Sequence, residues 1–452
     1  MKNPLAFNGD IICAVLEFVG YRQFFFIAPV SRVWKDAWNA QGRSTVTNCL
    51  SESQLLCALE NGLSRDQVEP CNTAASLGDL ELLLCARENG CAWNSVALFS
   101  AAEAGHLEII QWALHEDSWE GEDAMCVCSG AASGGHLDVL QWAWENYCPW
   151  DEDTCAAAAK GGHLEVLRWA RARGCPWDQR TCRNAADGRH HSVLQWARES
   201  GCSWCESTCS SAALRGDLAL LQWARANGCP WDSTTSCSAA AGGHLGVLQW
   251  ARESGCPWDE GVCTAAARGG HLVLLKWARV HDCPWDETTC GKAAGAGQLG
   301  ALQWARANEC PWDESTCSSA ARSGHLEILQ WARRSGCPCG VNTSSEAARG
   351  GHLTVLKWLR ATGCQWDEWT CRRAAEMGHL NVLKWAKERE CPWDEGTCTA
   401  AARGGHLDVL KWARANGCRW NDETCRRAVN AGHWAVVAWV RENGCPEREW
   451  FV

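Results

Sequence analysis

The chain contains 452 residues, of which 46% are hydrophobic, and it carries a formal net charge of −11 at pH 7. This acidic balance argues against nucleic acid as a partner, because phosphate binding needs a concentrated basic face. No apolar run approaches the roughly 20 residues that span a bilayer, and no export signal is evident near the start. We therefore expect a cytoplasmic or nuclear protein that does not bind membranes.

Residues 1–45 differ in composition from the rest of the chain and include a run of three phenylalanines at 24–26. The stretch from Asp10 to Val19 resembles the F-box segment "EVLLEILSFL" without a gap. The stretch from Phe24 to Trp34 resembles the later F-box segment "LLRLALVSRRW". An F-box is a small helical module that docks on the Skp-type adaptor of a cullin–RING ubiquitin ligase. The resemblance therefore implies an adaptor-binding module at residues 1–45.

Short apolar helices of this kind are too small to be stable alone and gain stability by packing on a partner. The pattern departs from that of F-boxes at Phe7-Asn8, where the family has Leu-Pro, and at Pro29. The alternative is a diverged N-terminal cap that covers the first unit of the array that follows. If the resemblance holds, the side chains that contact the adaptor are Ile12, Leu16, Phe18, Val19, Phe24, Ile27, Val30 and Trp34.

Residues 46–452 repeat with a period of 27 residues. We take the His of a recurring Gly-His-Leu motif, or its substitute, as the reference position of each repeat. Twelve of the 13 intervals are 27 residues, and one is 30 because of an insertion around residues 119–123. Such a period predicts a stacked array of about 14 units, with a half-repeat cap at 51–62 and a C-terminal cap at 434–452. The reference positions are Asp79, His106, His136, His163, His190, Asp217, His244, His271, Gln298, His325, His352, His379, His406 and His433.

One repeat, TCAAAAKGGHLEVLRWARARGCPWD at residues 154–178, predicts two helices joined by tight turns. The first helix is short and Ala-rich, and a Gly-Gly pair ends it because glycine tolerates the left-handed conformation. A second helix begins at His163 and has one broad apolar face. Gly174 ends this helix, and the Cys-Pro-Trp-Asp turn leads to the next one, which Asp178 can cap. The repeat therefore predicts an all-α solenoid of helix pairs.

The 32 cysteines mostly occupy two repeated positions: 13 lie twelve residues after the reference position, and 11 lie eight residues before it. Disulfides are rare in the reducing compartments that we expect, and zinc needs four clustered ligands rather than the Cys-x6-Cys spacing found here. A free cysteine behaves as a small buried hydrophobe. We therefore predict that these cysteines pack in the core, and we expect no bound metal and no cofactor.

The 31 tryptophans follow the period as well: 13 lie six residues after the reference position, and 11 lie fourteen after it. We expect the first set to fill volume between repeats and the second set, in the turns, to be partly exposed. The alternative is a platform on which nucleic acid bases stack. The reference His is replaced by Asp79, Asp217 and Gln298 in three repeats. This mixture favours a role in capping the second helix over a role as a metal ligand.

Segments such as Gly405-His406-Leu407-Asp408-Val409-Leu410-Lys411 resemble the ankyrin repeat stretch "LAAxxGHLEVVKLLLEAGADVN". Ankyrin repeats run to 33 residues. The six residues missing here fall where the β-hairpin finger of an ankyrin repeat would be. We therefore expect ankyrin-like helix pairs with short or absent fingers.

In ankyrin-like stacks the first helix lines the concave side, where protein targets bind. Seven and six residues before the reference position, the first helix varies in chemistry from repeat to repeat. These positions are either a recognition surface or a plain solvated face. The candidate target-binding residues there are Arg183, Asn184, Ser210, Lys292, Arg372, Arg373, Arg426 and Arg427.

The two resemblances together imply a substrate-recognition subunit, in which the N-terminal module engages the adaptor and the array holds a target protein. The alternative is a binding scaffold with no link to ubiquitin, and we expect a monomer in either case. No P-loop, GxGxxG motif or nucleophile elbow appears, so we expect no enzyme activity.

Overall fold

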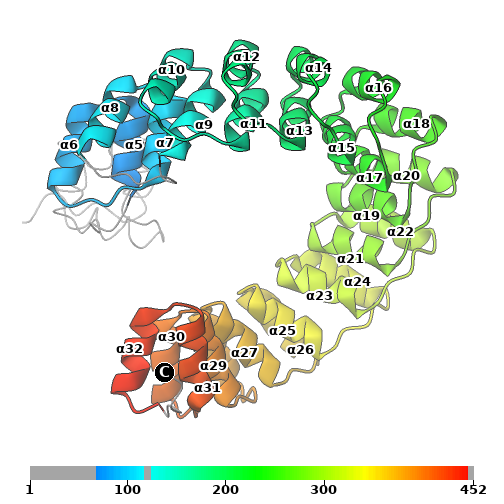
Figure 1. The fold of residues 1–452 in the computed structure, drawn as a ribbon. Coiled ribbons are helices and arrows are strands. Elements are labelled where there is room, and N and C mark those ends of the chain that lie inside the picture. The colour runs from blue at the N-terminus through cyan, green and yellow to red at the C-terminus, as the bar shows by residue number, and fades with distance from the viewer. Residues whose placement is uncertain (1–67, 117–123, 446–452) are drawn as a thin grey trace, which may run out of the picture. The chain divides into compact units, whose positions relative to one another are not determined.

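The protein is an all-α solenoid of helix pairs (Figure 1). The computed structural model describes residues 68–116 and 124–445, and this part of the chain contains 28 helices and no strand. The predicted fold class is confirmed. The F-box-like module at 1–45, the half-repeat cap at 51–62, the insertion near 119–123 and the tail from 446 onward lie outside the described residues.

Each repeat supplies a first helix of nine or ten residues, which precedes the reference position. These helices are α5 (Glu69–Leu77), α7 (Ser95–Glu103), α9 (Met125–Gly134), α11 (Glu152–Gly161), α13 (Gln179–Asp187), α15 (Glu206–Leu214), α17 (Ser233–Ala241), α19 (Glu260–Gly269), α21 (Glu287–Gly295), α23 (Glu314–Arg322), α25 (Val341–Arg349), α27 (Glu368–Glu376), α29 (Glu395–Arg403) and α31 (Asp422–Asn430).

A second helix follows each reference position. These helices are α6 (Leu80–Glu88), α8 (Leu107–Glu116), α10 (Leu137–Glu145), α12 (Leu164–Ala172), α14 (His191–Glu199), α16 (Leu218–Ala226), α18 (Leu245–Glu253), α20 (Leu272–Val280), α22 (Leu299–Ala307), α24 (Leu326–Arg334), α26 (Leu353–Ala361), α28 (Leu380–Glu388), α30 (Leu407–Ala415) and α32 (Trp434–Glu442). The last of these forms the described part of the predicted C-terminal cap.

The helices divide into two compact units whose boundary falls within α15 and α16. In the N-terminal unit, α5, α7, α9, α11 and α13 pack on one another in chain order, and each second helix packs on its own first helix. The C-terminal unit repeats this arrangement from α17 to α32. Each unit therefore has a layer of first helices and a layer of second helices (Figure 1).

The helix boundaries follow from residues that recur with the period. Asp178 precedes α13, and its carboxylate accepts a hydrogen bond from the backbone N–H of Arg180 at 2.8 Å. Gly162 follows α11 with φ of +81°, a left-handed conformation that costs glycine little. Gly174 takes the same conformation in the turn after α12. These turns confirm the predicted helix ends.

The core lies between the two layers and consists of small and branched side chains. Leu167 and Ala170 on α12 and Ala159 on α11 are at most 1% exposed. Alanine has no side chain beyond Cβ, so the first helices can approach one another closely. Between the repeats, the chain passes from α12 to α13 through residues 173–178 without a strand. The prediction of absent fingers is confirmed for the described repeats.

Within the described residues, no helix is long and apolar enough to cross a membrane.

Candidate functional site

The reference histidines connect neighbouring repeats, and the predicted capping role is wrong. Nε2 of His163 donates a hydrogen bond to the backbone carbonyl oxygen of Ser133, at a distance of 2.9 Å. Ser133 lies near the end of α9, where helix carbonyl oxygens lack partners within the helix. The same contact recurs in both units, for example from His379 to Arg349 at 3.0 Å. The imidazole reaches across to the preceding repeat and makes no cap hydrogen bond to its own helix.

The shorter Asp side chains at the reference position behave as the sequence predicted. Asp79 accepts a hydrogen bond from the N–H of Leu82 at 2.9 Å, and Asp217 accepts one from the N–H of Leu220 at 3.0 Å. A carboxylate attached directly to Cβ reaches the N–H groups of its own helix. The length of the side chain therefore decides which helix end it satisfies.

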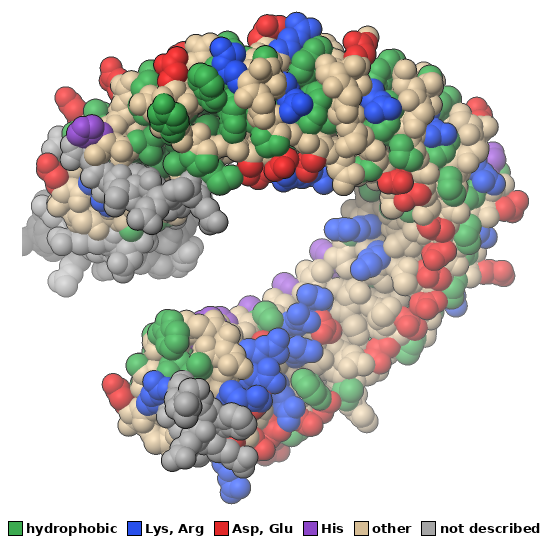
Figure 2. Space-filling model, viewed as in Figure 1, with side chains coloured by type: hydrophobic (Ala, Val, Ile, Leu, Met, Phe, Trp, Pro, Cys, Tyr) green, Lys and Arg blue, Asp and Glu red, His purple; other side chains and the backbone are tan. Residues whose placement is uncertain are grey.

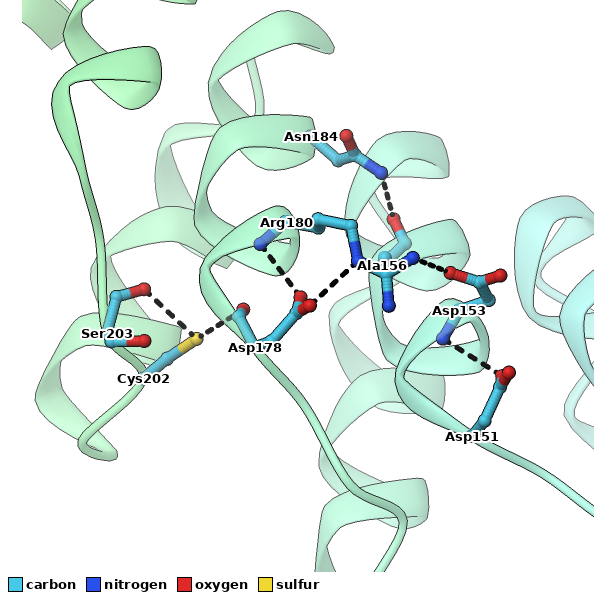
Figure 3. A network of polar contacts seen from close by, with 8 residues as sticks. All are labelled: Asp151, Asp153, Ala156, Asp178, Arg180, Asn184, Cys202 and Ser203. Carbon is cyan, nitrogen blue, oxygen red and sulfur yellow. Dashed lines mark hydrogen bonds and ion pairs between the residues drawn. The ribbon is translucent and has the colours of Figure 1, made fainter.

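The described cysteines at the two repeated positions pack in the core, as predicted, apart from Cys148, which is half-buried. Cys155 and Cys175 are fully buried. The Cys175 thiol donates to the backbone carbonyl of Asp151 at 3.5 Å, and Cys202 makes the same contact with Asp178 at 3.3 Å (Figure 3). Burial raises the pKa of the Cys71 thiol to about 12. Among the described residues, no three His, Cys, Asp or Glu side chains are arranged to hold a metal ion.

The two repeated tryptophans stack across most of the described boundaries between repeats. The rings of Trp177 and Trp196 lie 5.8 Å apart at an interplanar angle of 63°, which is an edge-to-face geometry. Both rings are half-buried. The prediction that the Trp of the second helix packs between repeats is confirmed, although its ring is not fully covered.

An arginine that was not among the predicted functional residues completes this stack. The guanidinium carbon of Arg171 lies 4.2 Å from the ring centroid of Trp177, and Nη1 also donates to the carbonyl oxygen of Cys175. Arg198 donates to the carbonyl of Cys202 at 3.2 Å. The signal was present in the sequence, because most repeats have an Arg or Lys eight residues after the reference position. These side chains hold the turn against the second helix.

The predicted target-binding residues lie on the first helices, but two of them serve the fold. The amide of Asn184 donates to the carbonyl of Ala156 at 3.1 Å and so joins α13 to α11 (Figure 3). The Ser210 hydroxyl donates to Ser207 within α15 at 3.1 Å. Arg183 is exposed on α13, and Lys292 is exposed on α21. The structure therefore retains these two side chains as candidates.

The four remaining candidates lie on α27 and α31 in the C-terminal unit. Arg372 and Arg373 are half-buried, and Arg426 and Arg427 are exposed. Because α27 packs on α29 and α29 packs on α31, these side chains belong to one layer of first helices. All four form ion pairs.

Three carboxylates in this layer are each paired with two arginines. Glu376 on α27 lies 2.7 Å from Nη1 of Arg373 and 3.3 Å from Nη1 of Arg403 on α29. Glu423 on α31 lies 2.8 Å from Nε of Arg426 and 2.7 Å from Nε of Arg427. The Arg426 pair lowers the pKa of the Glu423 carboxyl, so this carboxylate remains charged at neutral pH.

The third carboxylate of this kind is Glu346 on α25. It lies 3.6 Å from Nε of Arg322 on α23 and 3.9 Å from Nη1 of Arg349. We call each group of one glutamate and its two arginines a triad. In each triad two positive charges face one negative charge, so each triad keeps a net charge of about +1. Figure 2 shows Lys and Arg side chains gathered over this part of the C-terminal unit.

The N-terminal unit pairs charges differently. Arg180 on α13 contacts Asp178 at 2.7 Å and also pairs with Asp153 on α11 (Figure 3). One arginine here lies between two carboxylates, the reverse of the ratio in the C-terminal triads. Arg180 was not among the predicted site residues.

No protein-family model matches the sequence, and no curated protein matches it. The solved structures that resemble the fold include the human ASB11 ankyrin repeat domain, with 16% identity, a TM-score of 0.29, and coverage of 35% of this chain and 84% of that one. They also include the pentatricopeptide repeat protein PPR10 in complex with an 18-nt psaJ RNA element, with 13% identity, a TM-score of 0.33, and coverage of 99% and 93%.

Proposed function

We propose that this protein is a scaffold that binds a partner protein on the layer of first helices. The observation that carries the proposal is a division of roles within the repeat. The Cys, His and Trp positions, and the Arg eight residues after the reference position, are engaged in packing between and within repeats. The exposed positions of the first helices instead change chemistry from one repeat to the next.

Two positions show this contrast directly. The position seven residues before the reference position is exposed Arg183 in α13, half-buried Thr264 in α19 and exposed Arg426 in α31. The cysteine one residue earlier in the chain, such as Cys182, is fully buried and recurs in most repeats. Stack-building residues are constrained by their neighbours, whereas exposed ones are available to match a partner.

We propose a binding role in preference to catalysis. The Asp residues that recur in the turns, such as Asp151 and Asp178, cap the helices that follow them. Copies of one capping carboxylate spread along an array do not form a single acid–base site.

Site-specific photo-crosslinking tests this proposal. A photoreactive residue replaces Lys292 or Arg373 on first helices of the full chain, and, as matched controls, Lys276 on α20 or Lys384 on α28, both exposed on second helices. After irradiation in a cell extract, covalent protein adducts are expected from the first-helix positions and not from the controls. Adducts of equal yield at all four positions would contradict the proposal.

A more specific form of the proposal adds an adaptor. The resemblance of residues 1–45 to an F-box supports a substrate-recognition subunit of a Skp–cullin ubiquitin ligase, in which the array holds the target. The test uses the full chain and a purified Skp-type adaptor. The native chain is expected to co-elute with the adaptor, and a Leu16→Asp, Trp34→Ala variant is expected to lose the complex. If neither chain binds, the protein is a scaffold with no ubiquitin link.

The same proposal places the chain in the cytoplasm or nucleus as a monomer. Light scattering on the purified full chain checks the oligomeric state, with a mass near 49.6 kDa expected.

A further inference from the structure

The C-terminal repeats differ in charge from the rest of the chain. Residues 341–445 contain 15 Lys and Arg against 12 Asp and Glu, whereas the remainder contains 27 against 41. The repeats from α25 to α32 are therefore net basic within an acidic protein. Because charge complementarity steers association, such a local reversal favours a partner of opposite sign.

The first helices α25, α27, α29 and α31 carry as many Asp and Glu as Lys and Arg in total, but their acidic residues lie mostly in the first turns and their arginines further along, where they form what we call the arginine surface. It consists of the six triad arginines, Arg322, Arg349, Arg373, Arg403, Arg426 and Arg427. A guanidinium has five N–H donors, of which the ion pairs described above use one or two. The surface can therefore donate further hydrogen bonds to carboxylates, in the forked geometry that arginine favours.

An exposed tryptophan lies beside this surface. Trp369 on α27 is 46% exposed, and the guanidinium carbons of Arg372 and Arg373 lie 4.8 and 5.5 Å from its ring centroid. Arg372 is in turn oriented by Asp394, whose carboxylate accepts from Nε at 2.9 Å. Tryptophan and arginine are the side chains most enriched among residues that dominate protein–protein binding energy. An apolar side chain of the partner would cover the ring.

We propose that the arginine surface and Trp369 bind an extended acidic segment of a partner protein. This inference rests on the proposed function and specifies the chemistry of the target. The first helices stack at intervals of roughly 9 Å, and an extended peptide rises about 3.3 Å per residue. About three residues of the segment therefore span one repeat. Glu346, Glu376 and Glu423 lie on α25, α27 and α31, one and then two repeats apart.

The carboxylates within the triads favour a peptide over nucleic acid. A nucleic acid strand carries a phosphate at every nucleotide, so a strand laid along these helices would bring phosphates close to Glu346, Glu376 and Glu423. A peptide can place acidic residues opposite the arginines and neutral residues opposite the glutamates. Specificity then comes from the spacing of the acidic residues.

Fluorescence anisotropy on the full chain tests the inference. The probe is a labelled peptide of about 12 residues that carries one leucine and three glutamates, separated by about three and about six residues. A second peptide has glutamine in place of each glutamate, and a third probe is an oligouridylate of similar length. We expect the native chain to bind the glutamate peptide with an affinity that falls as the salt concentration is raised. We expect it to bind the glutamine peptide at least about tenfold more weakly.

Charge variants make the test specific to the surface. A double variant, Arg373→Gln with Arg403→Gln, is expected to weaken binding of the acidic peptide about tenfold or more. The matched control is Arg268→Gln, because Arg268 is exposed on α19 and occupies the same place in its repeat as Arg403. It is expected to leave affinity unchanged. Glu376→Gln, which removes a negative charge from a triad, is expected to tighten binding.

Three results would overturn the inference: equal affinity for the acidic and glutamine peptides, an equal loss in the Arg268 variant, or tighter binding of the oligouridylate than of the acidic peptide. Circular dichroism of each variant separates loss of binding from loss of folding. If the native chain does not bind the acidic peptide but first-helix positions still crosslink to a protein, the proposed function stands and only the acidic target is wrong.

Discussion

The imidazole of His163 lies against Gly135, the glycine in left-handed conformation that follows α9 in the preceding repeat. A Cβ atom built on Gly135 would come within 2.8 Å of Cγ of the imidazole, and the glycine has φ of +80°. The Gly of one Gly-His-Leu motif therefore contacts the His of the next motif along the chain. This contact explains why the two residues recur together.

Replacement of Gly135 with alanine is expected to lower the free energy of unfolding by about 1–3 kcal/mol, through backbone strain and the clash with the imidazole. His163→Ala removes the hydrogen bond to Ser133 and is expected to cost about 1 kcal/mol. In the double variant the clash is absent, so the cost should be smaller than the sum of the two. A urea-unfolding double-mutant cycle measures this coupling, and strict additivity would show that the ring and the glycine do not interact.

Arg198→Ala is expected to destabilise the protein by about 1–2 kcal/mol. The change removes the hydrogen bond to the Cys202 carbonyl and the contact of the guanidinium with Trp204, whose centroid lies 4.6 Å away. Arg183→Ala, at an exposed position on α13, serves as the control and should cost less than about 0.5 kcal/mol. Urea midpoints followed by tryptophan fluorescence measure both. Equal losses would remove the structural role assigned to Arg198.

Thr316→Val is expected to be neutral or stabilising by up to about 1 kcal/mol. The Thr316 hydroxyl is buried and has no hydrogen-bond partner, so its removal relieves a desolvation cost. Thr289 is equally buried but lies 3.1 Å from the hydroxyl of Thr264. Thr289→Val should therefore destabilise the protein. Thermal unfolding of the two variants shows whether each substitution raises or lowers stability. A loss of stability in Thr316→Val as large as that in Thr289→Val would contradict this account.

Cys339 is expected to be the most reactive of the described cysteines. It occupies the turn position that holds Trp in most other repeats, and hydrogen bonds from Cys317 and Cys364 lower its thiol pKa. A lowered pKa keeps the thiolate present as the pH falls, so alkylation by iodoacetamide should persist below the ordinary thiol pKa of about 8.5. Cys71, whose pKa burial raises to about 12, should remain unmodified.

Peptide mass mapping of the folded chain after brief alkylation locates the modified cysteines. Cys339→Ser provides the control, because it should abolish the early adduct. Rapid modification that disappears below pH 8, or that occurs equally at Cys71, would contradict the assignment.

Much of the fold follows from the sequence because the stack repeats one set of local signals. Asp178 and Gly162 mark helix ends through their own backbone preferences, and the buried positions of Cys155 and Leu167 follow from periodicity. Each of these predictions needs only residues within one repeat. This is why the helix pairs and the buried cysteines were predictable.

The site was less predictable because its contacts cross repeats. His163 could be assigned to its own helix or to the preceding repeat, and only the length of the imidazole decides between them. Similarly, the pairing of Glu376 with Arg373 and Arg403 joins residues on two helices, and sequence spacing alone does not indicate it. The candidates Arg372, Arg373, Arg426 and Arg427 were found from their variation between repeats, but the triads that surround them were not.

Hydrogen exchange of the full chain tests the central claim most directly, with and without a partner protein recovered by the crosslinking described above. We predict slower amide exchange on binding in first helices such as α25, α27 and α29, with no change in the second helices α26, α28 and α30. Protection confined to the second helices or to the turns between repeats would contradict the claim that the first-helix layer binds the partner.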